Sequence, residues 1–258
     1  MKEKIKQYWK WGMVSSILVV GAFGLYVYHW EHRKPVLEVY FFSLNKGRAI
    51  FMRTPQNKTI LLGGGQTSEI IREITKIMPF YRRKLDFVIV PSAVPAQIGE
   101  LVEILDRYDV GEIIMPKILA TSTALSALEW KIHKNKIHTE EVERGDEVVL
   151  DEQTKAEILF PYKDFKFNKS SLPELGLSVS FGSTSAYFIG NLSKTIQKDI
   201  AKNIATSTTK NLIEFYNTAA ESKVFPDLLE KIQPSFTFST KEKTAYAVSS
   251  GESWEVTR

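Results

Sequence analysis

The chain has 258 residues, of which 43% are hydrophobic and 25% are charged, a balance typical of globular proteins. It contains no cysteine, which excludes disulfide bonds, thiolate metal ligands and a cysteine nucleophile. Residues 1–35 hold six of the 34 basic residues and two of the 30 acidic ones, so the whole formal charge of +4 lies there. Residues 36–258 are therefore electrically balanced, which argues against broad phosphate binding by the globular part.

An uncharged segment runs from Trp11 to Trp30 and is long enough to cross the hydrocarbon core of a bilayer. Tryptophan and tyrosine residues cluster toward its two ends, where such side chains favour the membrane interface. We predict a transmembrane helix, a signal anchor, at 11–30. A signal peptide cut after Ala22-Phe23-Gly24 is the main alternative; a buried core helix is disfavoured because the segment is apolar all round.

Four lysines precede this segment, which favours a cytoplasmic N-terminus. The predicted organisation is a cytoplasmic N-terminus at 1–10, the membrane helix, a juxtamembrane linker at 31–36, and one domain at 37–258. We expect a single-pass protein of the cell membrane with this domain outside the cytoplasm.

After Pro35, short β patterns are followed by alternating helices and strands, and the second half repeats this order. The predicted strands of the first half are Val36–Phe42, Ala49–Thr54, Thr59–Leu62, Phe87–Val90 and 112–115, with helices near Ile70–Met78, from Gln97 to Leu105 and near Leu125–Ile132. The predicted strands of the second half are Asp146–Leu150, Ala156–Phe160, a hairpin over Leu177–Ile189 turning at Gly182, 211–216, 235–239 and 253–256, with helices after Ser193 and through Leu228. Two such passes predict an α/β fold, a four-layer αββα sandwich with two sheets inside and helices outside.

This order and several phrases resemble the metallo-β-lactamase fold superfamily, and most closely the soluble domain of the ComEC-type channel of DNA uptake in competent bacteria. "SLNKGRA" after Phe42 is similar to the family's Asp-Val-Gly-Gln-Gly-Asp-Ala phrase, and "RTPQNKTILLGGG" is similar to its Arg-Thr-Pro and Ile-Asp-Gly-Gly phrases. "PSAVPAQIGE" falls on the metal motif Thr-His-x-His-x-Asp-His-Ile-Gly-Gly, while "YFIGNLS" and "IEFYNTAAES" fall on the phrases ending in Thr-Gly-Asp and in His-His-Gly-Ser.

The matched ligand positions hold residues that bind metal poorly or not at all. The resemblance implies that these vestigial positions are Ser43, Gly63, Ser92, Val94, Ala96, Gln97, Asn191, Asn217 and Thr218. Zinc needs imidazole, carboxylate or thiolate ligands, and without the ion there is no activated water. We therefore expect no catalytic residues, no metal ligands and no cofactor, neither zinc nor manganese.

The predicted function is that of a membrane-anchored, catalytically inactive binding or scaffold protein, with a protein partner and a link to competence that the resemblance alone implies. The alternative is a hydrolase of this fold, nuclease- or phosphodiesterase-like, with a relocated or metal-independent site. Nucleic-acid binding is a further alternative.

A glycine loop, a pair of histidines and Ser92 are further candidates for a binding or catalytic site. Gly63, Gly64 and Gly65 form a candidate anion-binding loop, although a tight turn is the favoured interpretation. His133 and His138 are five residues apart, a spacing that does not align two ligands on one helix face. Ser92 has no G-x-S-x-G elbow and is not predicted to be a nucleophile.

A basic patch interleaved with two aromatic residues is the remaining candidate. It comprises Arg72, Lys76, Phe80, Tyr81, Arg82, Arg83 and Lys84. Such a patch could contact nucleic acid or anionic lipid, but a solvated helix end is the favoured interpretation.

Overall fold

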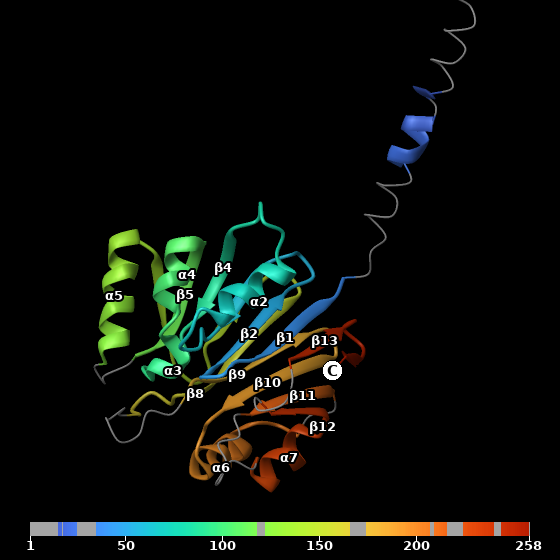
Figure 1. Cartoon of the computed structure of the whole chain (residues 1–258). Coiled ribbons are helices and arrows are strands. Elements are labelled where there is room, and N and C mark those ends of the chain that lie inside the picture. The colour runs from blue at the N-terminus through green and yellow to red at the C-terminus, as the bar shows by residue number, and fades with distance from the viewer. Residues whose placement is uncertain are drawn as a thin grey trace, which may run out of the picture. The chain divides into compact units, whose positions relative to one another are not determined.

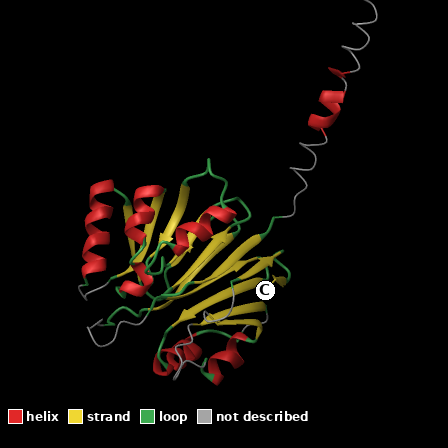
Figure 2. Ribbon diagram, in the orientation of Figure 1, coloured by secondary structure: helices red, strands yellow, loops and turns green. Residues whose placement is uncertain are grey.

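Two β-sheets lie face to face within residues 36–258, and helices cover the outer face of each sheet (Figures 1 and 2). The computed structural model describes residues 15, 16, 18–24, 35–117, 122–165, 174–206, 209–215, 224–239 and 244–257. Residues 1–35 form a separate unit, in which 15, 16 and 18–24 are helical. Most of the predicted membrane helix at 11–30 thus lies outside the described residues, and no described helix is long and apolar enough to cross a bilayer.

The larger sheet has eight strands in the order β14-β13-β1-β2-β3-β4-β5-β6. Their bounds are β1 Leu37–Ser43, β2 Arg48–Arg53, β3 Thr59–Leu62, β4 Lys84–Ile89, β5 Asp109–Pro116, β6 His138–Val142, β13 Ala245–Ser249 and β14 Trp254–Thr257. Antiparallel pairing joins β1, β2 and β3, whereas β3 to β6 pair in parallel. The parallel strands need crossover helices, which are α2 Glu69–Ile77, α3 Pro95–Ile98, α4 Leu101–Arg107 and α5 Thr123–Asn135.

The smaller sheet has six strands in the order β12-β11-β10-β9-β8-β7. Their bounds are β7 Glu147–Val149, β8 Thr154–Phe160, β9 Gly176–Phe181, β10 Thr184–Gly190, β11 Lys210–Phe215 and β12 Pro234–Ser239. The hairpin of β9 and β10 turns at Gly182, which has a positive φ of 58°, as predicted. Helices α6 Lys194–Asn203 and α7 Pro226–Ile232 cover this sheet.

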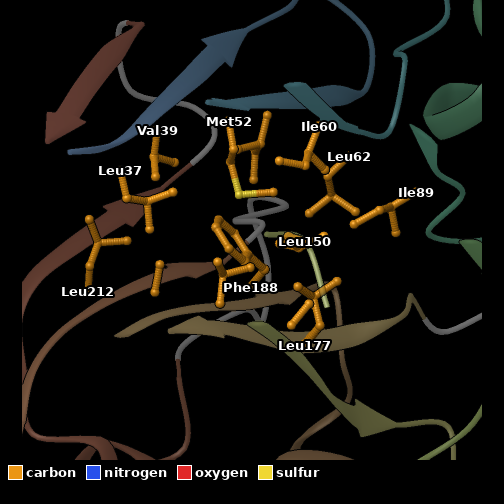
Figure 3. Close-up of a cluster of buried hydrophobic side chains, with 14 of the residues drawn as sticks. Leu37, Val39, Met52, Ile60, Leu62, Ile89, Leu150, Leu177, Phe188 and Leu212 are labelled. Atoms are coloured by element: carbon orange, nitrogen blue, oxygen red, sulfur yellow. The ribbon is translucent and has the colours of Figure 1, made fainter. Parts of the chain in front are cut away.

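The four layers enclose three hydrophobic clusters of described residues. The largest lies between the sheets, where Val39, Met52 and Phe188 meet (Figure 3). Alternate residues of one strand serve different clusters: Val39 faces the other sheet, while Phe42 packs under the helices. This alternation explains why strands buried on both faces read as continuous apolar runs.

The structure corrects two expectations about elements. The single helix expected from Gln97 to Leu105 is two helices, α3 and α4, because the Glu100 amide donates to the Gly65 carbonyl at 3.2 Å instead of continuing the helical ladder. Strand β6, "HTEEV", was not predicted, because its residues are mostly polar and give no buried alternation.

Candidate functional site

The family motifs converge at one end of the two sheets, where four buried polar residues meet. Arg48 begins β2, and Gln97 lies in α3, which follows the loop after β4. Glu174 precedes β9, and Glu214 lies near the end of β11. Their exposed fractions are 1%, 4%, 3% and 0%, in that order. Such complete burial of charge requires internal partners.

The Arg48 guanidinium supplies these partners. Its Nε donates to Glu174 Oε2 at 2.9 Å, and its Nη1 donates to Glu214 Oε2. Nη2 lies 2.7 Å from Glu174 Oε2 but without the alignment of a hydrogen bond. The Gln97 amide Nε2 donates to Glu174 Oε1 at 2.8 Å. We call Arg48, Gln97, Glu174 and Glu214 the arginine–carboxylate network.

The electrostatics of the network follow from one cation facing two carboxylates. Burial raises the pKa of Glu214 above its ordinary value, and the attraction of Arg48 offsets this only in part. Burial alone would lower the pKa of Arg48, but Glu174 and Glu214 reverse this effect and raise it. Arg48 is thus a permanent cation, and Glu214 takes up a proton more readily than it would in water.

Two glycines make room for the network and its loop. Gly190, at the end of β10, has a φ of 54°, and a Cβ there would lie 2.3 Å from Glu174 Oε2 and 2.7 Å from Arg48 Nη2. Gly47 has a φ of 87°, and a Cβ there would lie 1.6 Å from the Ala96 carbonyl oxygen. Only glycine combines this backbone region with this close approach. Both glycines belong to the family-like phrases of the sequence.

The vestigial positions on the loop after β4 are close together. Ser92 is buried and its Oγ accepts from the Val94 amide at 3.3 Å, while Val94 and Ala96 are half-buried. Gln97 is the one of these positions that belongs to the arginine–carboxylate network, through its hydrogen bond to Glu174.

The remaining vestigial positions are distributed around this end of the sheets. Ser43 is exposed at the end of β1, and Asn191 is exposed directly after β10. Asn217 and Thr218 lie outside the described residues.

Two of the backbone amides of the glycine loop donate hydrogen bonds within the domain. The Gly63 amide donates to the Ile89 carbonyl at 3.0 Å, and the Gly64 amide donates to the Gln97 carbonyl at 2.7 Å. All three glycines, Gly63, Gly64 and Gly65, are buried. Anion binding by this loop stays a prediction.

The two histidines lie at the β6 edge of the larger sheet. His133 on α5 and His138 on β6 line a hollow of about 740 Å³ together with Glu129 and Glu141. His138 Nε2 is 3.4 Å from Glu112 Oε1. Within the described ranges, no three His, Cys, Asp or Glu residues are arranged to hold a metal ion.

The described side chains of the site do not fit the metal that the resemblance implies. Ser92, Val94 and Ala96 offer one hydroxyl and two aliphatic groups, where zinc needs imidazole, carboxylate or thiolate. The nearby carboxylates of Glu174 and Glu214 are already bound by Arg48, whose positive charge would repel a metal cation at the same place.

Sequence reasoning missed Arg48, Glu174 and Glu214. Arg48 and Glu214 could have been noticed, because each is a single charged residue in an apolar strand pattern. These patterns are "GRAIFM" and "NLIEF". Charged residues in such positions are seldom buried unless they are paired. Their partners could not be identified, because they lie 126 and 166 residues apart in the sequence.

No protein-family model matches this sequence, and no curated protein matches it. Among solved structures, the metallo-β-lactamase fold protein YhfI from Bacillus subtilis is similar with a TM-score of 0.54 at 9% identity, over 80% of this chain and 86% of that one. CmlA, a diiron β-hydroxylase from Streptomyces venezuelae, is similar with a TM-score of 0.50 at 15% identity, over 81% of this chain and 45% of that one. This chain thus matches less than half of the length of CmlA. At these identities the similarity shows the fold alone: the chain has the metallo-β-lactamase fold.

Proposed function

We propose that this chain is a membrane-anchored metallo-β-lactamase-fold protein that acts by binding, with an arginine–carboxylate network in place of a metal centre. The observation that carries the proposal is the position of Arg48, which lies between Glu174 and Glu214 beside Gln97. Gln97 occupies the place that the resemblance assigns to the last histidine of the metal motif. A guanidinium at this place pairs with Glu174 Oε2 and Glu214 Oε2 without providing a Lewis acid or an activated water.

The metal content of the full chain tests this proposal. We expect protein purified from cells grown with added zinc and manganese to contain neither metal at a stoichiometric level. We also expect no hydrolysis of bis(p-nitrophenyl) phosphate. One metal ion per chain, or turnover that a chelator abolishes, would refute the proposal and favour a hydrolase of this fold.

A variant sharpens the test by removing the resident cation. In Arg48→Ala, the carboxylates of Glu174 and Glu214 lose their partner, so added Mn²⁺ should raise its melting temperature while leaving the wild-type value unchanged. The matched control R48A/E174Q/E214Q lacks both carboxylates and should not respond to Mn²⁺. An equal response of the wild type would show that Arg48 does not take the place of a cation.

The membrane anchor is proposed from the uncharged segment at 11–30. We expect the full chain to stay in the membrane pellet at alkaline pH, and a chain without 1–30 to be released. Because the sequence has no cysteine, single-cysteine variants report orientation directly. A membrane-impermeant maleimide should label Glu252→Cys, on the exposed turn after β13, in intact cells, and Lys4→Cys only after lysis. The reverse pattern would overturn the proposed orientation.

The proposed partner is a protein of the same envelope, and the resemblance to the ComEC-type domain suggests the DNA-uptake machinery. Crosslinking of intact membranes followed by purification of the full chain tests this step. Recovery of a competence channel protein, lost when residues 37–258 are deleted but the anchor is kept, would support it. Recovery of that protein with the anchor alone would refute a role for the domain.

A further inference from the structure

The loop between α2 and β4 exposes two neighbouring aromatic side chains. Phe80 is 89% exposed and Tyr81 is 77% exposed. Their rings contact each other edge-to-face at 5.5 Å between centroids. Single exposed apolar residues are ordinary, but two adjacent aromatic rings at the tip of a loop form a patch that favours an apolar or interfacial partner.

Positive charge follows these rings directly. Arg82, Arg83 and Lys84 are consecutive, and no acidic residue lies between Met78 and Lys84. Lys84 forms an ion pair with Asp86 at 3.3 Å. Arg82 donates to a main-chain carbonyl, and within the described ranges neither Arg82 nor Arg83 forms an ion pair. The exposed guanidinium of Arg83 is therefore available for an anionic partner, as are the N–H groups of the half-buried Arg82 that do not donate to Asn57.

A small hollow lies beside the two arginines. Its volume is about 170 Å³, and it is lined by Met78, Phe80, Arg82, Arg83 and Arg107 among others. Arg107 is paired with a glutamate of its own helix. The guanidinium groups of Arg82 and Arg83 that line it are donors of the kind that bind a phosphate group.

Strand directions place this loop at the end of the sheet where the chain enters the domain. Strand β1 is antiparallel to β2, β2 is antiparallel to β3, and β3 is parallel to β4. The first residues of β1 and β4, Leu37 and Lys84, therefore lie at the same end (Figure 1).

We propose that residues 79–84 dock on the surface of a bilayer that contains anionic lipids. Phe80 and Tyr81 enter the interfacial region, where aromatic rings are favoured. Arg82 and Arg83 bind headgroup phosphates, and each basic residue near an anionic surface strengthens binding about fivefold. The proposal extends the membrane anchor of the proposed function, but it is measured without that anchor.

The experiment uses residues 36–258, because all three hydrophobic clusters are built from residues of this range. Co-sedimentation is measured with vesicles of phosphatidylcholine, with and without phosphatidylglycerol. We expect binding only to the anionic vesicles, weakened more than tenfold in R82Q/R83Q and also in F80S/Y81S. Trp130→Ala removes an aromatic residue on α5 that is 61% exposed and serves as the matched control, with unchanged binding.

Three results would overturn the proposal. The first is equal binding to both kinds of vesicle, and the second is an equal loss in Trp130→Ala. The third is binding of single-stranded DNA or inorganic phosphate that depends on Arg82 and Arg83 when vesicles are not bound, because the patch would then serve another anion. Alkaline extraction of the full chain reports on residues 11–30 alone, so failure of the loop and failure of the anchor are distinguishable.

Discussion

Replacing Arg48 by methionine would leave two buried carboxylates without their cation. The side chain is 1% exposed, and the side chains of both partners, Glu174 and Glu214, are no more than 4% exposed. Removing one partner of a buried ion pair typically destabilises a protein by about 3–5 kcal/mol. That is a large part of the total stability of a domain, which is about 5–15 kcal/mol. The urea midpoint should therefore fall by roughly 1–2 M.

The loss in Arg48→Met should depend on pH in a defined direction. Burial already raises the pKa of Glu214, and loss of the guanidinium raises it further. A carboxyl with a raised folded-state pKa stabilises the fold below its unfolded value and loses this contribution as pH rises through the folded value. The deficit of the variant should thus be smaller at about pH 5 than at about pH 8.

Urea unfolding followed by circular dichroism measures both effects. The control R48M/E174Q/E214Q removes every charge of the network, and we expect it to recover most of the lost stability because neutral replacement of a buried ion pair is often nearly neutral. A loss below about 1 kcal/mol in Arg48→Met, in the range of surface substitutions, would refute the reasoning. A triple variant no more stable than the single one would refute it equally.

Three further changes test other parts of the fold by the same unfolding measurement. Gly47→Ala places a Cβ 1.6 Å from the Ala96 carbonyl oxygen at a positive φ, so it should cost more than about 2 kcal/mol; a neutral result would mean that the loop adjusts freely. Thr59→Val removes a hydroxyl 3.1 Å from Asp86 Oδ2 and should cost about 1–2 kcal/mol. Burial raises the pKa of Asp86, but hydrogen bonds from Thr59 outweigh this effect and lower it. The stability that ionised Asp86 gives the wild type is therefore lost only as pH falls through the lowered pKa, and Thr59→Val should lose this stability at a higher pH. An unchanged Asp86 titration by NMR would contradict this prediction. Ser122→Ala removes the N-cap hydroxyl of α5, which accepts an amide at 3.1 Å, and should cost about 1 kcal/mol, whereas Ser122→Asp should retain the stability.

The layers of the fold could be predicted from sequence because each strand and helix carries a local period. The runs at Val36–Phe42 and Thr59–Leu62 are strands in the structure, and Gly182 turns the hairpin. The prediction was wrong where a hydrogen bond between residues far apart in the sequence decides the structure instead of the local sequence pattern. A period cannot show that the Glu100 amide bonds to Gly65, and it cannot identify a polar strand such as His138–Val142 that follows its neighbour through main-chain pairing.

The sequence marked one position of the arginine–carboxylate network but none of its charged residues. Family-like phrases identified Gln97, which does lie in the arginine–carboxylate network. The chemical character of the site depends on Arg48, Glu174 and Glu214, which come together only when both sheets have formed and packed. A sequence motif shows which metal ligands are missing at its own positions. It cannot show that charged residues from other parts of the chain lie at the same place in the fold.

Arg48 gives the domain a cation that is made with the polypeptide. A zinc or manganese ion must be acquired after synthesis, in competition with other metals, and it can be withdrawn again by chelation. A guanidinium is present in a ratio of one per molecule, stays protonated at any physiological pH and cannot be exchanged. In the proposed function this end of the sheets needs no metal, and the domain would then reach its folded state in surroundings depleted of transition metals.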